Sequence, residues 1–315
     1  MILRNIFNKL KKKKFKIIIL FSLLIYLLLY FLIKNEFFYN ASQYTTTYLN
    51  YYINTYLSNI ADDLIFDNGI IMHIESDVQN IFSSLFIYVV SFNNKIFLIF
   101  SIIMTLYVFY YISSIFYNDI FNKGAISKVF RIGEKKYLND TIVTNSIYCG
   151  LLFLIPKILY FILLNVFFPN GVSYVHFLGQ TSFLSEKFLY VAYNCSPIMM
   201  ICLDFALSFL YGIIISLISL IIISIIKNKS LSYIAFIFFI SSISIIQSIF
   251  NLSPLIFYNS IFYYFNFYTT ISLELNVFEP IIFSVIISSV LYIITRYILR
   301  SRIRMRIWKN YLRNL

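Results

Sequence analysis

Few side chains in this sequence could perform catalysis, and they do not form a familiar catalytic set. The two histidines, His73 and His176, lie far apart, and neither belongs to an H-E-x-x-H pattern that would place two zinc ligands on one helix face. The sequence has no G-x-x-x-x-G-K-[ST] segment, so the chain cannot hydrolyse ATP in the manner of P-loop proteins. We therefore predict that it is not an enzyme and that it holds no catalytic residue, metal ion or cofactor.

Two charged residues stand inside long apolar stretches and are the best candidates for a polar function there. Lys157 follows Pro156 in the middle of one stretch, and Asp204 lies near the start of the next. Charged side chains inside a membrane are costly, and they usually face the interior of a helical bundle or water. The two can pair, because consecutive spans run antiparallel, or they can lie on a substrate path. Structural pairing is the simpler interpretation.

The composition indicates an integral membrane protein. Hydrophobic residues make up 60% of the 315 and charged residues only 12%, whereas a soluble domain has about 25% charged residues. Backbone polar groups in hydrocarbon need internal partners, which helices provide. We predict an all-α integral membrane protein with about six transmembrane helices. The six apolar stretches are residues 17–33, 96–116, 145–168, 197–226, 231–250 and 281–299.

The distribution of Lys and Arg predicts the orientation of these helices. Residues 1–16, 117–144, 227–230 and 296–315 carry 7, 5, 2 and 7 of them, whereas the segments on the opposite side carry three. Under the positive-inside rule both termini are cytoplasmic. The formal charge of +12 then meets anionic membrane lipids, not nucleic acid. The abundance of Ile, Lys, Asn, Phe and Tyr indicates an A/T-rich bacterial genome, and hence a bacterial cell membrane.

The sequence divides into a short N-terminal helix and one membrane domain. Residues 1–16 are predicted to form a cytoplasmic amphipathic interfacial helix, because apolar and basic side chains fall on opposite faces. Residues 17–315 are predicted to form a single six-helix transmembrane domain. This domain has a long outer loop, 34–95, and a cytoplasmic loop, 117–144. The apolar segment 255–268 is too short to cross the membrane, and we expect a re-entrant outer hairpin there, between spans five and six.

The cytoplasmic loop contains an amphipathic segment. Ile126, Val129 and Phe130 fall on one face of a predicted helix, and Gly124 and Gly133 bound it. Lys and Arg side chains surround this apolar face. An apolar face in the cytosol needs either a protein partner or the bilayer, and this pattern alone fits both.

The order of these features resembles the membrane permease subunits of six-helix ATP-binding-cassette (ABC) exporters. In that family an acidic residue after span two precedes a glycine segment, a short coupling helix and a turn into span three. The matching residues are Asp119, Gly124 to Ile126, Ser127 to Phe130, and Ile132 to Lys135. Aspartate stands where glutamate is more usual, and the Ser-Arg of the turn is missing.

The resemblance implies a fold, partners and a role for the loop. It implies a separate ABC ATPase subunit, a second permease copy or paralogue, and an amphipathic substrate such as a peptide antibiotic, a lipid or a drug. The residues that would couple the ATPase to the membrane domain are Asp119, Gly124, Ile126, Val129, Phe130 and Gly133. Two other classes stay open: a polytopic membrane enzyme or processing factor, and a non-transporting signalling or immunity protein.

Overall fold

The computed structural model describes residues 2–31 except 12, 14 and 29, residues 95–167 except 122, and residues 197–250 and 279–313. All regular secondary structure in these residues is helical. An additional apolar helix, Phe15–Leu28, follows the first helix of the chain. The labelled helices are α1 (Ile2–Leu10), α5 (Lys95–Phe121), α6 (Lys123–Ile132), α7 (Glu134–Phe167), α10 (Pro197–Ile226), α11 (Lys229–Phe250) and α13 (Glu279–Arg313).

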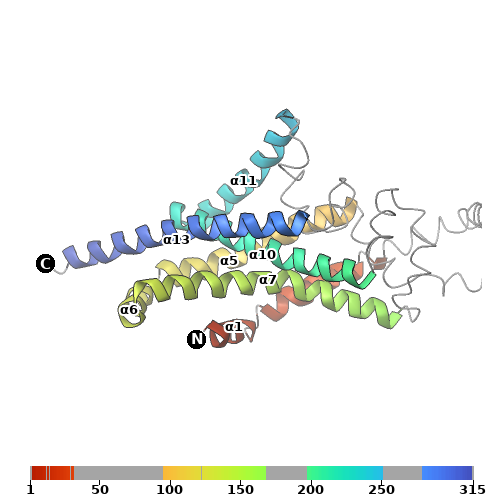
Figure 1. Cartoon of the computed structure of the whole chain (residues 1–315), viewed down its shortest axis with the longest axis horizontal. Helices are drawn as coiled ribbons and strands as arrows, with labels where there is room; N and C mark the ends of the chain where they lie inside the picture. The colour runs from red at the N-terminus through yellow and green to blue at the C-terminus, as the bar shows by residue number, and fades with distance from the viewer. Residues whose placement is uncertain are drawn as a thin grey trace, which may run out of the picture.

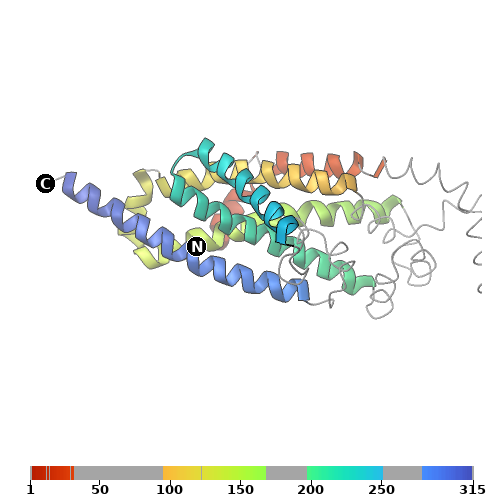
Figure 2. The same ribbon diagram turned by 90° about the horizontal axis from the view of Figure 1, so that it is seen from above.

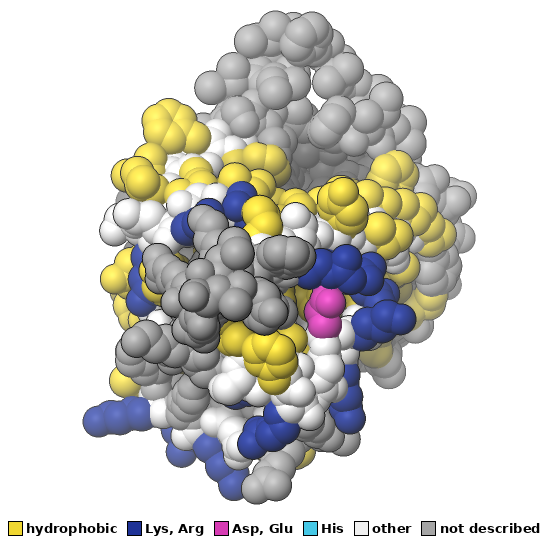
Figure 3. All heavy atoms as spheres, turned by 90° about the vertical axis from the view of Figure 1, so that its left-hand side faces the viewer, with side chains coloured by type: hydrophobic (Ala, Val, Ile, Leu, Met, Phe, Trp, Pro, Cys, Tyr) yellow, Lys and Arg dark blue, Asp and Glu magenta, His cyan; other side chains and the backbone are white. Residues whose placement is uncertain are grey.

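The long helices run side by side along the long axis of the bundle (Figure 1). Helix α10 lies among them and packs against α5, α7, α11 and α13. Helix α11 diverges from the bundle axis, as Figure 2 also shows. Helices α1 and α6 and the C-terminal turns of α13 lie at one end, which we call the basic end. In Figure 3, which faces this end, Lys and Arg side chains are spread over the surface.

Three helical segments in the described residues are long and apolar enough to cross a membrane: Glu134–Val166, Ile201–Ile226 and Ile281–Met305. Three shorter apolar segments are Phe15–Leu28, Ile102–Asn118 and Lys229–Phe239. The prediction of a helical protein with several membrane-length helices is therefore confirmed, and these helices indicate a multi-pass membrane protein. The predicted hairpin at 255–268 and most of the outer loop 34–95 lie outside the described residues.

Serine hydroxyls within the apolar helices bond to the backbone of their own helix. Ser22, Ser208, Ser219 and Ser224 each donate to the carbonyl four residues earlier, at 2.6–2.8 Å. All four are fully buried. Such bonds satisfy a polar side chain in an apolar environment within its own helix, and Ser22 also donates to the Met104 sulfur of α5 at 3.3 Å. These four serines are thus compatible with the apolar interior of the bundle.

Helices α7 and α10 approach each other closely at two glycines. A Cβ atom on Gly212 would lie 2.6 Å from the Cys149 carbonyl oxygen and 2.6 Å from the Gly150 Cα. A Cβ atom on Gly150 would lie 2.6 Å from the ring of Phe209 and 3.0 Å from its carbonyl oxygen. Small residues let helix backbones meet in this way within membranes. The contact places the middle of α7 directly beside α10.

Helix α1 packs on the basic end of α7 and is not simply a free surface helix. Ile6 is buried, and the Lys9 ammonium donates to the Asn145 side-chain oxygen. Phe7, on the other face, is exposed. The predicted interfacial segment 1–16 therefore contains two helical parts, because a turn at Lys11 separates α1 from the helix that includes Phe15–Leu28.

Candidate functional site

Lys157 and Asp204 form an ion pair inside the bundle. The Lys157 Nζ donates to Asp204 Oδ1 at 2.9 Å and to Oδ2 at 3.1 Å. Neither side chain is exposed to solvent at all. The structure thus brings together the two charges that the sequence placed in consecutive apolar helices, α7 and α10. A buried pair of this geometry partly offsets the desolvation of both ions, which would be severe for either alone.

Aromatic side chains pair with each other on and beside the helices that carry this ion pair. Tyr26 and Tyr160 stack with ring centroids 5.3 Å apart, and both are buried. Tyr26 also lies close enough to Asp204 to interact with it electrostatically. Phe161 packs edge-on against Phe205, one residue beyond Asp204, at 6.2 Å. The pair is fully buried in this conformation, which favours a structural role over an open substrate path.

The coupling segment forms α6, but its apolar residues do not share one exposed face. Val129 and Ala125 are buried against the bundle, Ile126 is partly buried and Phe130 is 72% exposed. The expectation of a single face with Val129 and Phe130 together is therefore wrong. Consecutive residues project about 100° apart around a helix. When α6 packs through positions 125 and 129, the next residue, Phe130, turns outward.

Three further residues of the predicted coupling set lie at helix boundaries. Asp119 lies in the last turn of α5, and Gly124 lies in the first turn of α6. Gly133 joins α6 to α7 with φ at 84°, a conformation that glycine adopts without strain. Its N–H donates to the Val129 carbonyl at 2.9 Å, and its carbonyl accepts from the Tyr137 N–H at 3.0 Å. Gly133 therefore fixes the angle between α6 and α7.

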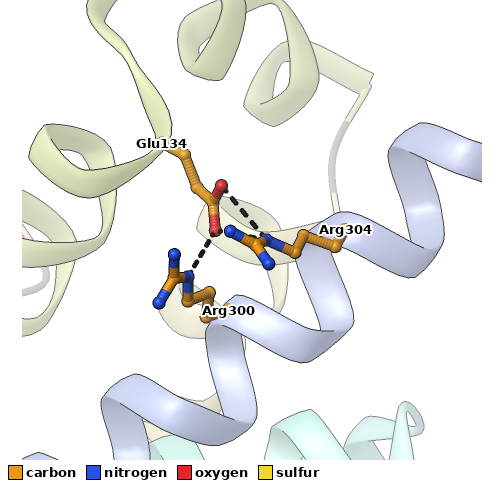
Figure 4. A network of polar contacts seen from close by, with 3 residues as sticks. All are labelled: Glu134, Arg300 and Arg304. Atoms are coloured by element: carbon orange, nitrogen blue, oxygen red, sulfur yellow. Dashed lines mark hydrogen bonds and ion pairs between the residues drawn. The ribbon is translucent and has the colours of Figure 1, made fainter.

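Glu134 links this junction to α13, a contact that the sequence did not suggest. Arg300 and Arg304 each donate through Nε to the Glu134 carboxylate at 3.2 Å (Figure 4). The two arginines are four residues apart, so they lie on the same face of α13. Both are about half exposed and Glu134 is 25% exposed. The first residue of α7 is thereby tied to the basic end of α13.

The described helices define the class of the chain as a helical, multi-pass membrane protein. In this part of the chain no group of three or more His, Cys, Asp or Glu side chains could hold a metal ion. His73 and His176 lie outside the described residues. Comparison with models of protein families, with curated proteins and with solved structures found no match.

Proposed function

We propose that this chain is the membrane-spanning permease subunit of an ABC exporter in a bacterial cell membrane. The observation that supports this most directly is the position of α6. This short helix lies at the basic end between two long helices, α5 and α7, and turns Phe130 outward with 72% of its surface exposed. An exposed aromatic side chain among basic residues suits a protein interface, where such residues contribute most of the binding energy.

The contacts of α6 support a mechanical role in this proposal. Val129 and Ala125 pack into the bundle, Gly133 sets the angle to α7, and Glu134 joins α7 to α13. A force applied by an ATPase at Phe130 would therefore reach α7 through packed contacts and the Gly133 junction, and α13 while the Glu134 ion pair is formed. Rigid-body movement of helices driven in this way is a common route to alternating access.

Six spans and cytoplasmic termini are part of the proposal. Helices α5 and α11 contain 27 and 22 residues, which at about 1.5 Å per residue exceeds the roughly 30 Å of the hydrocarbon core. The apolar helix Phe15–Leu28 overlaps the apolar stretch 17–33. With the three longest segments, these make six. The basic end then faces the cytoplasm under the positive-inside rule.

A path for substrate would need a second subunit. The ion pair of Lys157 and Asp204 is closed off in this conformation, so the interior of one bundle offers no open route there. Helix α13 exposes a continuous apolar face that can meet lipid or another subunit. We therefore propose a pair of permease subunits around an amphipathic substrate such as a peptide antibiotic, a lipid or a drug. Exposed members of that face include Ile282, Val285, Ile286, Val290 and Ile293.

The substitution Phe130→Asp tests the coupling role. It places a carboxylate at the proposed ATPase interface, where burial of an unpaired charge opposes binding. We expect the wild-type protein to copurify with an ATPase that carries a phosphate-binding loop. The variant should lose at least about tenfold of that ATPase and of the stimulated ATP hydrolysis, while its yield in the membrane stays unchanged.

Two matched variants separate this effect from a general one. Phe130→Leu keeps an apolar side chain and should retain the ATPase. Met305→Asp adds the same charge at another exposed apolar residue of the basic end, outside α6, and should also retain it. If the Phe130→Asp protein keeps a bound and stimulated ATPase, the proposed exporter function is wrong.

A further inference from the structure

A cavity of about 400 Å³ lies at the basic end, where α1, α6 and the first turns of α7 meet. It is distinct from the Lys157 and Asp204 pair and from the exposed face of Phe130. Its polar lining includes Asn5 and Lys9 from α1, Lys128 and Arg131 from α6, and Asp140 and Thr144 from α7. Three separate helices thus contribute polar groups to one half-open cavity.

The charges around the cavity favour an anion. Lys9, Lys128 and Arg131 supply three cations, against the single carboxylate of Asp140. Neither Lys128 nor Arg131 forms an ion pair with any carboxylate of the described residues. Cations gathered in a pocket raise the local concentration of anions and bind phosphate oxygens through charge-assisted hydrogen bonds.

Buried polar atoms at the cavity wall lack partners, which independently indicates a ligand. Thr144 is 3% exposed, and its hydroxyl has no hydrogen-bond partner among the described residues. The Oδ2 atom of Asp140 also has none. Buried polar groups are nearly always hydrogen-bonded, so an exception calls for a missing partner. The Thr144 hydroxyl can donate to a phosphate oxygen, and Asp140 can accept from a hydroxyl or ammonium group beside that phosphate.

The cavity also lies at the level of lipid headgroups. The apolar stretch of α7 begins at residue 145, immediately after Thr144. Phe7 on α1 is exposed beside the cavity residue Asn8. Basic pockets at this level between helices bind the phosphates of anionic lipids. We propose that the cavity is a phosphate-binding site of the kind that an anionic phospholipid headgroup fills. The site docks α1 and α6 onto α7, and it does not depend on transport activity.

Native mass spectrometry of the full, delipidated chain in detergent can test this site. The protein is titrated with phosphatidylglycerol, with phosphatidylcholine of the same acyl chains, and with glycerol 3-phosphate and inorganic phosphate. We expect one phosphatidylglycerol to bind in preference to phosphatidylcholine. The double variant Lys128→Gln/Arg131→Gln should weaken this binding by about tenfold or more. The control Lys11→Gln/Lys13→Gln removes two exposed charges of the same end outside the cavity and should change it less than about twofold.

The remaining arms decide the source of the phosphate. Binding of the lipid alone identifies a headgroup site. Binding of inorganic phosphate or glycerol 3-phosphate that also requires Lys128 and Arg131 identifies a soluble phosphate ligand of the same site. Thr144→Val removes the hydroxyl at nearly constant volume, should weaken binding by a few-fold, and decides the result if the double variant does not fold. Equal losses in the double variant and its control, or no binding of any phosphate compound, would overturn the proposal.

Discussion

Two ionic clusters connect helices in the described part of this protein, and they differ in almost every physical respect. The Lys157 and Asp204 pair is fully buried, lies within the bundle and joins α7 to α10. The cluster of Glu134 with Arg300 and Arg304 is part-exposed, lies at the basic end and joins α7 to α13. Tyr26 lies near the first, whereas the second is open to solvent.

This difference determines what each cluster can do. An ion buried without its partner costs several kcal/mol, so the buried pair strongly disfavours any arrangement that separates α7 from α10. A part-exposed pair loses little when it opens, because water replaces the partner. The buried pair therefore suits a fixed contact, and the exposed cluster suits a contact that can break and form as helices move.

The largest effect is expected from Asp204→Ala. The substitution leaves the Lys157 ammonium buried without its carboxylate, and we expect a loss of about 3–5 kcal/mol in stability. The combination Asp204→Ala/Lys157→Ala removes both charges and should recover part of that loss. Thermal unfolding in detergent measures both. Ser216→Ala is the control on α10, because its buried hydroxyl has no hydrogen-bond partner among the described residues. Strictly additive losses for the two charges would contradict the pairing.

An intermediate effect is expected from Gly212→Ala. The new Cβ atom would meet the Cys149 carbonyl oxygen and the Gly150 Cα, both at 2.6 Å. These are backbone atoms, so α7 and α10 must move apart, and we expect a loss of about 1–3 kcal/mol. The separation also strains the Lys157 and Asp204 pair. Combining Gly212→Ala with the double charge deletion should therefore lose less than the sum of the two effects. Full additivity would indicate that the glycine contact and the ion pair are independent.

The buried region could be predicted from the sequence to a considerable extent. Long apolar stretches predicted the helices, because a backbone in hydrocarbon must satisfy its own polar groups and a helix does so within one segment. The pairing of Lys157 with Asp204 could also be predicted. A charge in an apolar helix needs a partner of opposite charge, and these two charges lie in consecutive apolar stretches. The glycine contact was missed, although Gly150 and Gly212 are two of only seven glycines and lie in the middle of apolar helices.

The basic end could be predicted less well. Helical spacing grouped Val129 with Phe130, but the rotation of α6 about its axis depends on tertiary packing, and this buries Val129. The link from Glu134 to Arg300 spans 166 residues of sequence. Many basic side chains at that end could have met the carboxylate equally well, since exposed charges have weak preferences. The partners in solvent-exposed contacts are therefore difficult to predict from a single sequence.

The smallest effect is expected from Glu134→Gln, and it is the sharpest test of the difference between the two clusters. The substitution removes the carboxylate that both Arg300 and Arg304 contact. Because these groups are part-exposed, we expect a loss of stability below about 1 kcal/mol. This loss should disappear at about 1 M salt, because the Debye screening length is then about 3 Å and the attraction between exposed charges is screened. Arg302→Gln is the control on α13, because Arg302 forms no ion pair among the described residues, and it should have no such salt-dependent effect.

The Asp204→Ala loss should persist at high salt, since ions do not reach the buried pair. If Glu134→Gln destabilises the protein as strongly as Asp204→Ala and equally at all salt concentrations, the cluster is a fixed part of the fold and cannot serve as a contact that opens during movement.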